Sequence, residues 1–520
     1  MEEFEKKKKI TIISIVIIII VVLISVIFLL TKNNKKTTSK TNSEIKASAY
    51  KISGNSLEDF DLYFLQLENA KKNKVYSPLS IKYALEMLEE GTNGQSKKQI
   101  SNIIGEYKGK KYINNENMSF ANAVFIKESY KDSIKENYVN TLKNKYNAEV
   151  IYDSLKNTNN INSWISNKTL NLINNALSNL GEDPRFILVN ALGIDMEWEE
   201  KFLKCLGGCS AIYSHEKFSW YGPETVTANN FNNDQEVAGM KIIASLNNYD
   251  IVNELKEDKI REIVGNAYRE YLAEDPYDLN GDLSEENINK VVNEYLDKYI
   301  ENINSNYKRI DKTTDFSHYV DTNIKAFAKD LKEYNGTTLQ YVAIMPQSEE
   351  LDSYIKNINA SKINEIINKL KNLKNENFKD GVITKITGFI PKFKFDYSLN
   401  FQDDLKTLGI TDIFDKNKAD MTGITSEKNI FVEKAIHKAN IEFTQDGIKA
   451  SAASTFEGGL GSGEFDYSFD VPIEEIDLTF DKPYMFIIRD KNSGEVWFTG
   501  TVYEPLEWTK DPDYCNANEC

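Results

Sequence analysis

A segment near the C-terminus first alternates apolar and polar residues and then becomes small and neutral. Ile441 and Phe443 alternate with polar neighbours, which predicts a strand. After Gly447 the period of two continues, and one of its two faces carries no charge. That face is formed by Ile448, Ala450, Ala452, Ser454, Phe456 and Gly458. Because further glycines follow at 459, 461 and 463, the pattern predicts a loop that can also be buried as a strand in a sheet.

Other segments predict a mixture of strands and helices. Residues 120–126 (FANAVFI) read as a strand, 161–169 (INSWISNKT) as a helix that crosses a sheet, and 188–202 as a strand that ends near Trp198. Further motifs lie at 73–81 (NKVYSPLSI), 91–94, 391–394, 408–412 (LGITD), 419–424 (ADMTGI), 481–490 (DKPYMFIIRD) and 498–502. In this order they resemble the serpins, the serine protease inhibitor family, over residues 56–505 apart from one insertion.

The resemblance implies an α+β fold with a large mixed central sheet, smaller sheets, about nine helices and an exposed reactive-centre loop at 447–472. It implies a loop hinge at Gln445, Asp446, Gly447, Ile448, Lys449, Ala450, Ser451, Ala452 and Ala453. It places the buried shutter and breach positions at Asn73, Ser77, Ser80, Asn190, Trp198 and His437. Two hinge residues depart from the family: Ile448 replaces the usual Thr or Ser, and Gln445 replaces an acidic residue.

The scissile bond follows from family spacing. Counting from His437 and Gly447 gives Gly461–Ser462. Since the segment up to Pro483 is longer than usual, bonds at Leu460, Phe465 and Tyr467 are alternatives.

The resemblance implies a suicide inhibitor rather than an enzyme. A serine, or papain-like cysteine, endopeptidase would attack the loop, form an acyl-enzyme and be trapped as the loop enters the central sheet. Two other functions are open: a non-inhibitory serpin that binds a ligand, and a cell-surface interaction protein that uses the serpin body as a scaffold. The uncharged Ala and Ser run favours inhibition, because charge on an inserting face would oppose burial.

About sixty residues within 246–313 are extra to the family pattern. Residues 260–272 and 287–303 predict two helices, and Ser284 has the position of an N-cap. Asp278, Asn280 and Asp282 resemble the start of a calcium loop, but Leu283 and Asn289 stand where Gly and Glu are needed. An acidic turn that caps the next helix is therefore favoured.

Residues 10–30 are uncharged and would span about 31 Å as a helix, enough to cross a bilayer. They predict a transmembrane signal anchor between a cytoplasmic tail at 1–9 and a flexible linker at 31–55, with a tail at 506–520 closing the chain. A long cleaved signal peptide is the alternative. The expectation is a membrane-anchored, bacterial serpin, single-pass in the cell membrane, with its serpin domain extracellular.

Composition excludes several functions. The net charge of −16 argues against a nucleic-acid partner. Cys205, Cys209, Cys515 and Cys520 allow three disulfide connectivities or, less readily, a zinc site. No nucleophile motif accompanies the three histidines, at 215, 318 and 437. We therefore expect a monomer without cofactor, metal or catalytic residues, whose partner is its target protease.

Overall fold

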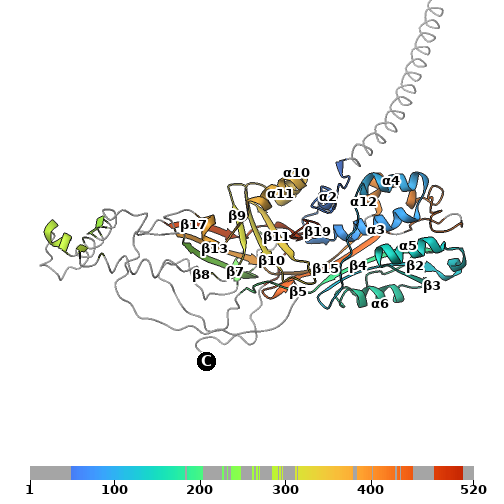
Figure 1. The fold of residues 1–520 in the computed structure, drawn as a ribbon, viewed down its shortest axis with the longest axis horizontal. Helices are drawn as coiled ribbons and strands as arrows, with labels where there is room; N and C mark the ends of the chain where they lie inside the picture. The colour runs from blue at the N-terminus through green and yellow to red at the C-terminus, as the bar shows by residue number, and fades with distance from the viewer. Residues whose placement is uncertain are drawn as a thin grey trace, which may run out of the picture.

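The computed structural model of the 520-residue chain describes most of the region from Ala49 to Glu507. The described residues are 49–68, 70–181, 184–202, 225–227, 231, 236–247, 311–312, 314–378, 383–400, 402–427, 430–433, 435–448 and 473–507, with parts of 261–296. Four sheets run along the length of the molecule in Figure 1.

The largest sheet has seven strands, and all neighbouring strands in it are antiparallel. Its order is β1 (Lys74–Tyr76), β19 (Val496–Val502), β18 (Tyr484–Asp490), β11 (Leu339–Pro346), β10 (Ile324–Asp330), β9 (Ser317–Val320) and β12 (Lys371–Asn372). The residues of β11 and β19 are buried throughout, including the polar Gln340, Thr499 and Thr501. Asn335 and Gly336 both have positive φ and turn the chain between β10 and β11, as the Asn-Gly pair predicts.

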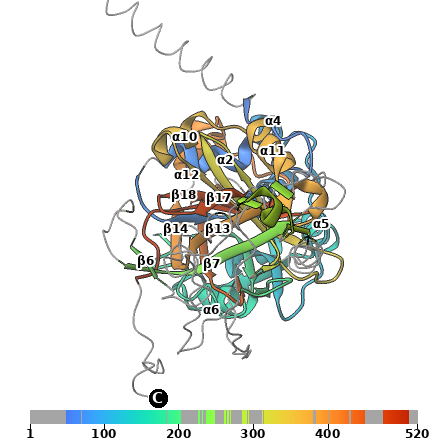
Figure 2. The ribbon, with the colours of Figure 1, turned by 90° about the vertical axis from the view of Figure 1, so that its left-hand side faces the viewer.

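A five-stranded sheet lies towards one end of the described structure. Figure 2 shows the molecule from that end. Its order is β17 (Ile473–Thr479), β13 (Ile383–Pro391), β7 (Glu236–Asn247) and β6 (Thr225–Thr227), with β8 (Asp311–Lys312) also paired to β7. The insertion therefore leaves the sheet after Asn247 and returns at Asp311, slightly inside the expected bounds of 246–313.

The expected central sheet is present in two parts. One part has β3 (Glu149–Asp153), β2 (Met118–Lys127) and β4 (Phe186–Ile194), in that order. The other has β14 (Phe393–Asn400), β15 (Ile436–Phe443), β16 (Gly447–Ile448) and β5 (Met196–Glu197). Since β2 pairs in parallel with β3 and antiparallel with β4, the sheet is mixed, as predicted.

Helices cover these sheets. They are α2 (Phe60–Leu67), α3 (Pro78–Gly91), α4 (Gly94–Ile104), α5 (Glu136–Tyr146), α6 (Asn159–Lys168), α10 (Leu351–Asn357), α11 (Ala360–Lys369) and α12 (Gln402–Thr407). Short 3₁₀ turns lie at Glu128–Ser133, Asn375–Asn377 and Asp412–Phe414.

Strand β2 shows why its sheet is buried on both faces. Phe120 and Val124 belong to the main core, whereas Ala123 and Phe125 belong to a second core that includes Trp164 of α6. A period of two sends alternate side chains to opposite faces, so an apolar run such as FANAVFI can fill two cores. The predicted helix at 161–169 is confirmed as α6.

The predicted single-pass membrane localisation is not supported by the structure. Within the described part of the chain, no helix is long and apolar enough to cross a bilayer. Residues 10–30, on which that prediction rested, lie outside the described residues.

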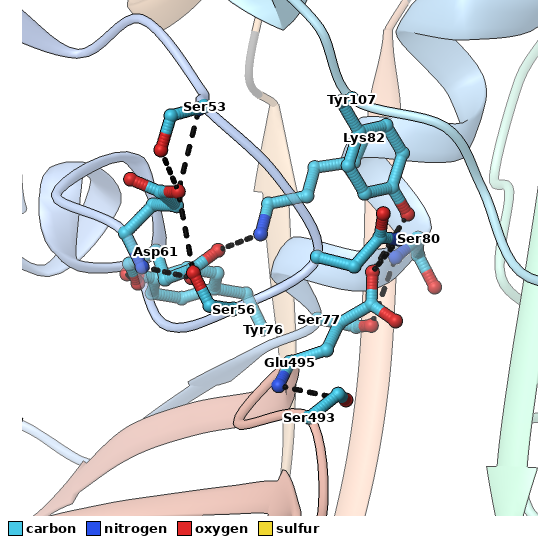
Figure 3. A network of polar contacts seen from close by, with 12 residues as sticks. Ser53, Ser56, Asp61, Tyr76, Ser77, Ser80, Lys82, Tyr107, Ser493 and Glu495 are labelled. Atoms are coloured by element: carbon cyan, nitrogen blue, oxygen red, sulfur yellow. Dashed lines mark hydrogen bonds and ion pairs between the residues drawn. The ribbon is translucent and has the colours of Figure 1, made fainter.

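A buried polar network ties the start of the described chain to the helices (Figure 3). Asp61 of α2 and Lys82 of α3 form an ion pair of 2.6 Å in which neither side chain is exposed. Burial raises the pKa of Asp61 to about 6, although Lys82 opposes the shift. Beside this pair, the buried Glu495 accepts hydrogen bonds from Tyr107 at 2.9 Å and Asn55 at 3.1 Å. The network joins segments that are far apart in sequence.

Replacing one partner of the buried pair should destabilise the protein strongly. In Lys82→Met the Asp61 carboxylate would lose its buried counter-charge, and we expect a loss of about 3–5 kcal/mol in denaturant unfolding. The double variant Asp61→Asn/Lys82→Met removes both charges and should be more stable than Lys82→Met alone. Equal or lower stability of the double variant would contradict this account.

Candidate functional site

The hinge is already part of a sheet. Strand β15 ends at Phe443, the chain turns, and β16 runs back beside it, with the amide of Thr444 donating to the carbonyl of Gly447 at 3.0 Å. On its other side β16 pairs with β5, Gly447 opposite Glu197 and Ile448 opposite Met196. The first two residues that leave the turn thus lie as a strand between β15 and β5.

Gly447 is needed because two backbones approach closely. A Cβ atom at this position would lie 2.2 Å from the carbonyl oxygen of Met196 and 2.7 Å from the Cα of Glu197. Both are backbone atoms, so rotating a side chain cannot relieve the contact. Glycine therefore allows β16 to sit against β5.

Trp198 fixes the turn from below. Its side chain is fully buried, and its indole N–H donates to the carbonyl of Thr444 at 2.8 Å. Its backbone amide donates to the carbonyl of Asp446 at 3.1 Å, and its ring contacts Phe443 edge to face at 5.4 Å. The backbone carbonyl of Gln445, also in the hinge, accepts from the backbone amide of Phe202 at 3.0 Å. The conformation of the turn is thus set by the segment 198–202.

Ile448 is accommodated rather than excluded. It is 1% exposed and lines a small cavity with Ile194 of β4, Ile441 of β15 and Phe498 of β19. Leu172 also lines this cavity, as do the polar Asn440 and Glu442, so a bulky apolar side chain has apolar neighbours on most sides.

Beyond β16, a gap separates β4 from β15. Among the described residues no backbone pairing links these two strands, although β4 pairs with β2 and β15 with β14. Two cavities, of about 50 and 30 Å³, lie along the gap, and Leu188 and Asn190 of β4 line both. Lys438 of β15 and Ile165 of α6 line the larger cavity. His437 of β15 lines the smaller cavity, which lies against α3. Each strand therefore presents an edge to the gap.

Two buried polar atoms next to the gap lack hydrogen-bond partners. The amide nitrogen of Asn190 donates to Asn122 at 2.5 Å, but its oxygen accepts no hydrogen bond. The hydroxyl of Ser80, on α3, is likewise without a partner. An unsatisfied buried polar atom costs about 1–3 kcal/mol, so both groups would be stabilised by a hydrogen-bond partner placed in the gap.

His437 and Ser77 meet beneath the gap. Nε2 of His437 accepts from the backbone amide of Ser77 at 2.9 Å, and the Ser77 hydroxyl caps α3 by accepting from the amide of Ser80. Burial lowers the pKa of His437 to about 4, so the ring is neutral at pH 7 and can act as an acceptor. The side chain holds the start of α3 against β15.

The remaining predicted positions divide into two groups. The side chain of Asn73 binds the backbone of residues 503–504, the segment that follows β19. The other predicted loop positions lie outside the described residues: Lys449 to Ala453, Leu460, Gly461, Ser462, Phe465 and Tyr467. The same holds for the four cysteines and for Asp278, Asn280 and Asp282. Sequence reasoning did not identify Asn122 or the pairing of β16 with β5, because neither has a local sequence signal.

Comparison with known proteins identifies the family. The model of the family Serpin (serine protease inhibitor) matches residues 59–206 and 308–505, more than half of the chain. An uncharacterized serpin-like protein of the archaeon Methanosarcina acetivorans is 22% identical over 479 residues, which cover 87% of each chain. The human leukocyte elastase inhibitor is 29% identical over 173 residues, 33% of this chain and 42% of that protein.

A solved structure agrees on the fold. The thermophilic serpin tengpin in its native state has a TM-score of 0.57 and 19% identity, over 87% of this chain and 97% of that one. The predicted α+β serpin fold is confirmed. The curated relatives named here are archaeal and human, so they give no support to the expected bacterial origin.

Gly447→Ala should release β16 from β5. The added methyl group would collide with the backbone of Met196, and losing one or two hydrogen bonds of about 1 kcal/mol each should speed amide exchange of 446–448 several-fold. Hydrogen–deuterium exchange with mass spectrometry measures this. Gly54→Ala, where nothing lies within 4 Å of the new Cβ, is the matched control. Unchanged exchange in the hinge variant would argue against this close approach.

Acidification should weaken the protein through His437. The pKa is about 6.5 in the unfolded chain and about 4 in the folded one, so the unfolded state binds more protons between these values. The stabilisation is complete above pH 6.5 and is lost as the pH falls towards 4, by up to about 3 kcal/mol. His437→Asn, which does not titrate, should lose less stability between pH 7 and 4.5 in denaturant unfolding. Equal losses in both proteins would refute this role.

Proposed function

The chain belongs to the serpin family, and we propose that it inhibits a serine endopeptidase, or a papain-like cysteine endopeptidase, by inserting its cleaved loop into the central sheet. The protease would attack the loop between Ile448 and Ile473 and remain attached to it as an acyl-enzyme. The freed loop would then enter between β4 and β15 and carry the protease away from its working position. The similarity to a leukocyte elastase inhibitor supports a protease as the partner.

The observation that carries the proposal is the position of β16. It lies between the C-terminal end of β15 and β5, the strand that follows β4, and so at one end of the gap between β4 and β15. It is already hydrogen-bonded as a strand. Insertion of the loop would extend an existing strand rather than begin a new one. The slow step of starting a strand is thereby avoided.

The energetics favour insertion. About fourteen residues would gain hydrogen bonds to the two edges, each worth about 0.5–1.5 kcal/mol net, or on the order of 10 kcal/mol together. The face that begins with Ile448 carries no charge as far as Gly458, so its burial meets no charge penalty. Asn190 and Ser80 supply polar atoms beside the path that still lack partners.

Ile448 is the residue of β16 from which the inserted strand would continue, so the mechanism requires it to stay buried. Its side chain is buried already and lines a cavity together with Ile194, Ile441 and Phe498. The family usually has a smaller polar residue here, and the built cavity compensates for the larger side chain.

Ile448→Arg should convert the inhibitor into a substrate. The guanidinium would bring a charge to a fully buried position, where the nearby Glu442 is already paired with Lys394, at a cost of several kcal/mol. We expect that β16 could then not form and that insertion would lag behind hydrolysis. Denaturing gels after incubation with the protease should show the cleaved chain and at least tenfold less covalent complex. Ile448→Val, which keeps an apolar side chain, should still trap the protease.

The wild-type chain is tested first against trypsin-, chymotrypsin-, elastase-, subtilisin- and papain-like proteases. A covalent band at the summed mass is expected with at least one, and mass spectrometry of the released peptide would locate the scissile bond. Cleavage of the loop without such a band by every protease would refute inhibition. Equal complex yields for Ile448→Arg and wild type would refute insertion as its mechanism.

A further inference from the structure

A cleft of about 230 Å³ lies against the segment that holds the hinge. It is several times larger than either cavity in the gap, and Glu199 and Glu200 of segment 198–202 form part of its lining. The rest of the described lining comes from β9, β10 and β12 and from residues next to these strands. A cavity needs only about 10–15 Å³ to hold one water molecule, so this cleft has room for a small organic molecule.

The buried lining of the cleft combines three apolar residues with one amine. Phe316, Ala328 and Leu373 are buried, and Lys329 of β10 is 3% exposed. Nζ of Lys329 lies 4.9 Å from the centre of the ring of Phe202, which is also buried. Such a lining suits a short molecule with an apolar chain.

The charged side chains of the lining are balanced by neighbours of opposite sign. Glu200 and Asp315 both form ion pairs with Lys312, and Asp330 pairs with Lys491 at 2.5 Å. The lining therefore has no excess of one sign that would require a charged ligand, and its apolar part favours an uncharged one.

Lys329 is a buried amine without a counter-charge. Its Nζ donates to the hydroxyl of Thr314 and, at 2.7 Å, to the carbonyl of Asp315, so both acceptors are neutral. It forms no ion pair with any carboxylate in the described part of the chain. The buried Lys325 of the same strand differs, because it pairs with Asp477 at 2.8 Å.

The missing counter-charge changes the protonation of Lys329. Burial lowers its pKa from the usual 10.5 to about 7, although Glu200, Asp315 and Asp330 oppose the shift, and Lys312 adds to it. About half of the molecules therefore carry a neutral amine at pH 7, compared with about one in 3,000 for an exposed lysine. The neutral form attacks electrophiles, and a desolvated lysine of lowered pKa is the kind that forms Schiff bases with carbonyl compounds.

We propose that the cleft is a capture site for small uncharged aldehydes and that the amine of Lys329 holds them as an imine. The nitrogen lone pair attacks the carbonyl carbon, and the oxygen takes up a proton. The nitrogen then gives up its remaining protons, the carbon–oxygen bond breaks and one water molecule leaves, so that R–NH₂ and R′–CHO give R–N=CH–R′ and H₂O. No oxidant or reductant takes part, and water reverses the reaction. The proposal does not depend on protease inhibition.

Labelling of the full chain with butanal and cyanoborohydride tests this capture. Cyanoborohydride reduces each imine to a stable secondary amine, and mass spectrometry of digests gives a labelling rate for each lysine. Lys374, an exposed residue that also lines the cleft, is the reference. At pH 7 we expect Lys329 to be labelled at least tenfold faster than Lys374. An equal or lower rate for Lys329 overturns the proposal.

The pH dependence distinguishes a reactive amine from an amine that is merely accessible. Above pH 7 the neutral form of Lys329 approaches its maximum, whereas the neutral fraction of an exposed lysine still rises about tenfold with each pH unit. The ratio of Lys329 labelling to Lys374 labelling should therefore fall about tenfold between pH 8 and pH 9. A ratio that stays constant contradicts the mechanism.

A variant of the lining tests whether the cleft is the route to the amine. Ser317→Leu places a larger side chain on the lining without changing Lys329, and should slow labelling of Lys329 at least fivefold relative to Lys374. The thermal midpoint of the variant, compared with that of wild type, shows whether it is folded. An unchanged ratio in the folded variant would mean that aldehydes reach Lys329 by another path, and would overturn the cleft as the site. The two measurements on wild type decide the proposal even where this variant does not fold.

Discussion

The proposed function of this protein depends on the gap between β4 and β15. Among the described residues β4 pairs only with β2, and β15 pairs with β14 along its length but with β16 only at Phe443. The rest of the two edges that face the gap has unused hydrogen-bonding capacity. The turn at 444–447, held by Trp198, aims the chain into that gap and lets β16 occupy its head. A sheet with an unfilled strand position beside a chain of suitable pattern is a metastable arrangement, because a state with more pairing is within reach.

Helices on both faces of the sheet hold β4 and β15 in place although the two strands are not hydrogen-bonded to each other in the described residues. On one side α3 carries Ser77 and Ser80 beneath the gap and is fixed by His437 and by the buried pair of Lys82 with Asp61. On the other side α6 packs Trp164 and Ile165 against β2 and β4. Both layers hold the two halves of the sheet in place. Under the proposed mechanism the energy of insertion would be released when the loop is cut rather than during folding.

Much of the fold could be predicted from the sequence, because its signals are local. The apolar run of β2, the helix α6, the Asn-Gly turn and the cap at Ser284 each depend on residues a few positions apart. The site was harder to predict, because its contacts are long-range. Nothing near Asn122 or Met196 indicates that these residues face Asn190 and Gly447, and nothing near Asn73 indicates that it binds the backbone of residues 503–504. The membrane prediction has no support in the described fold, because it rested on residues 10–30, which lie outside the described residues.

The most direct test of loop insertion is the thermal midpoint of the intact protein compared with that of the same protein after a protease has cut its loop. If the cut loop fills the gap, gaining on the order of 10 kcal/mol, the midpoint should rise by on the order of 10–20 °C. A midpoint that is unchanged or lower after cleavage would mean that the gap between β4 and β15 does not accept the loop, and would contradict the account.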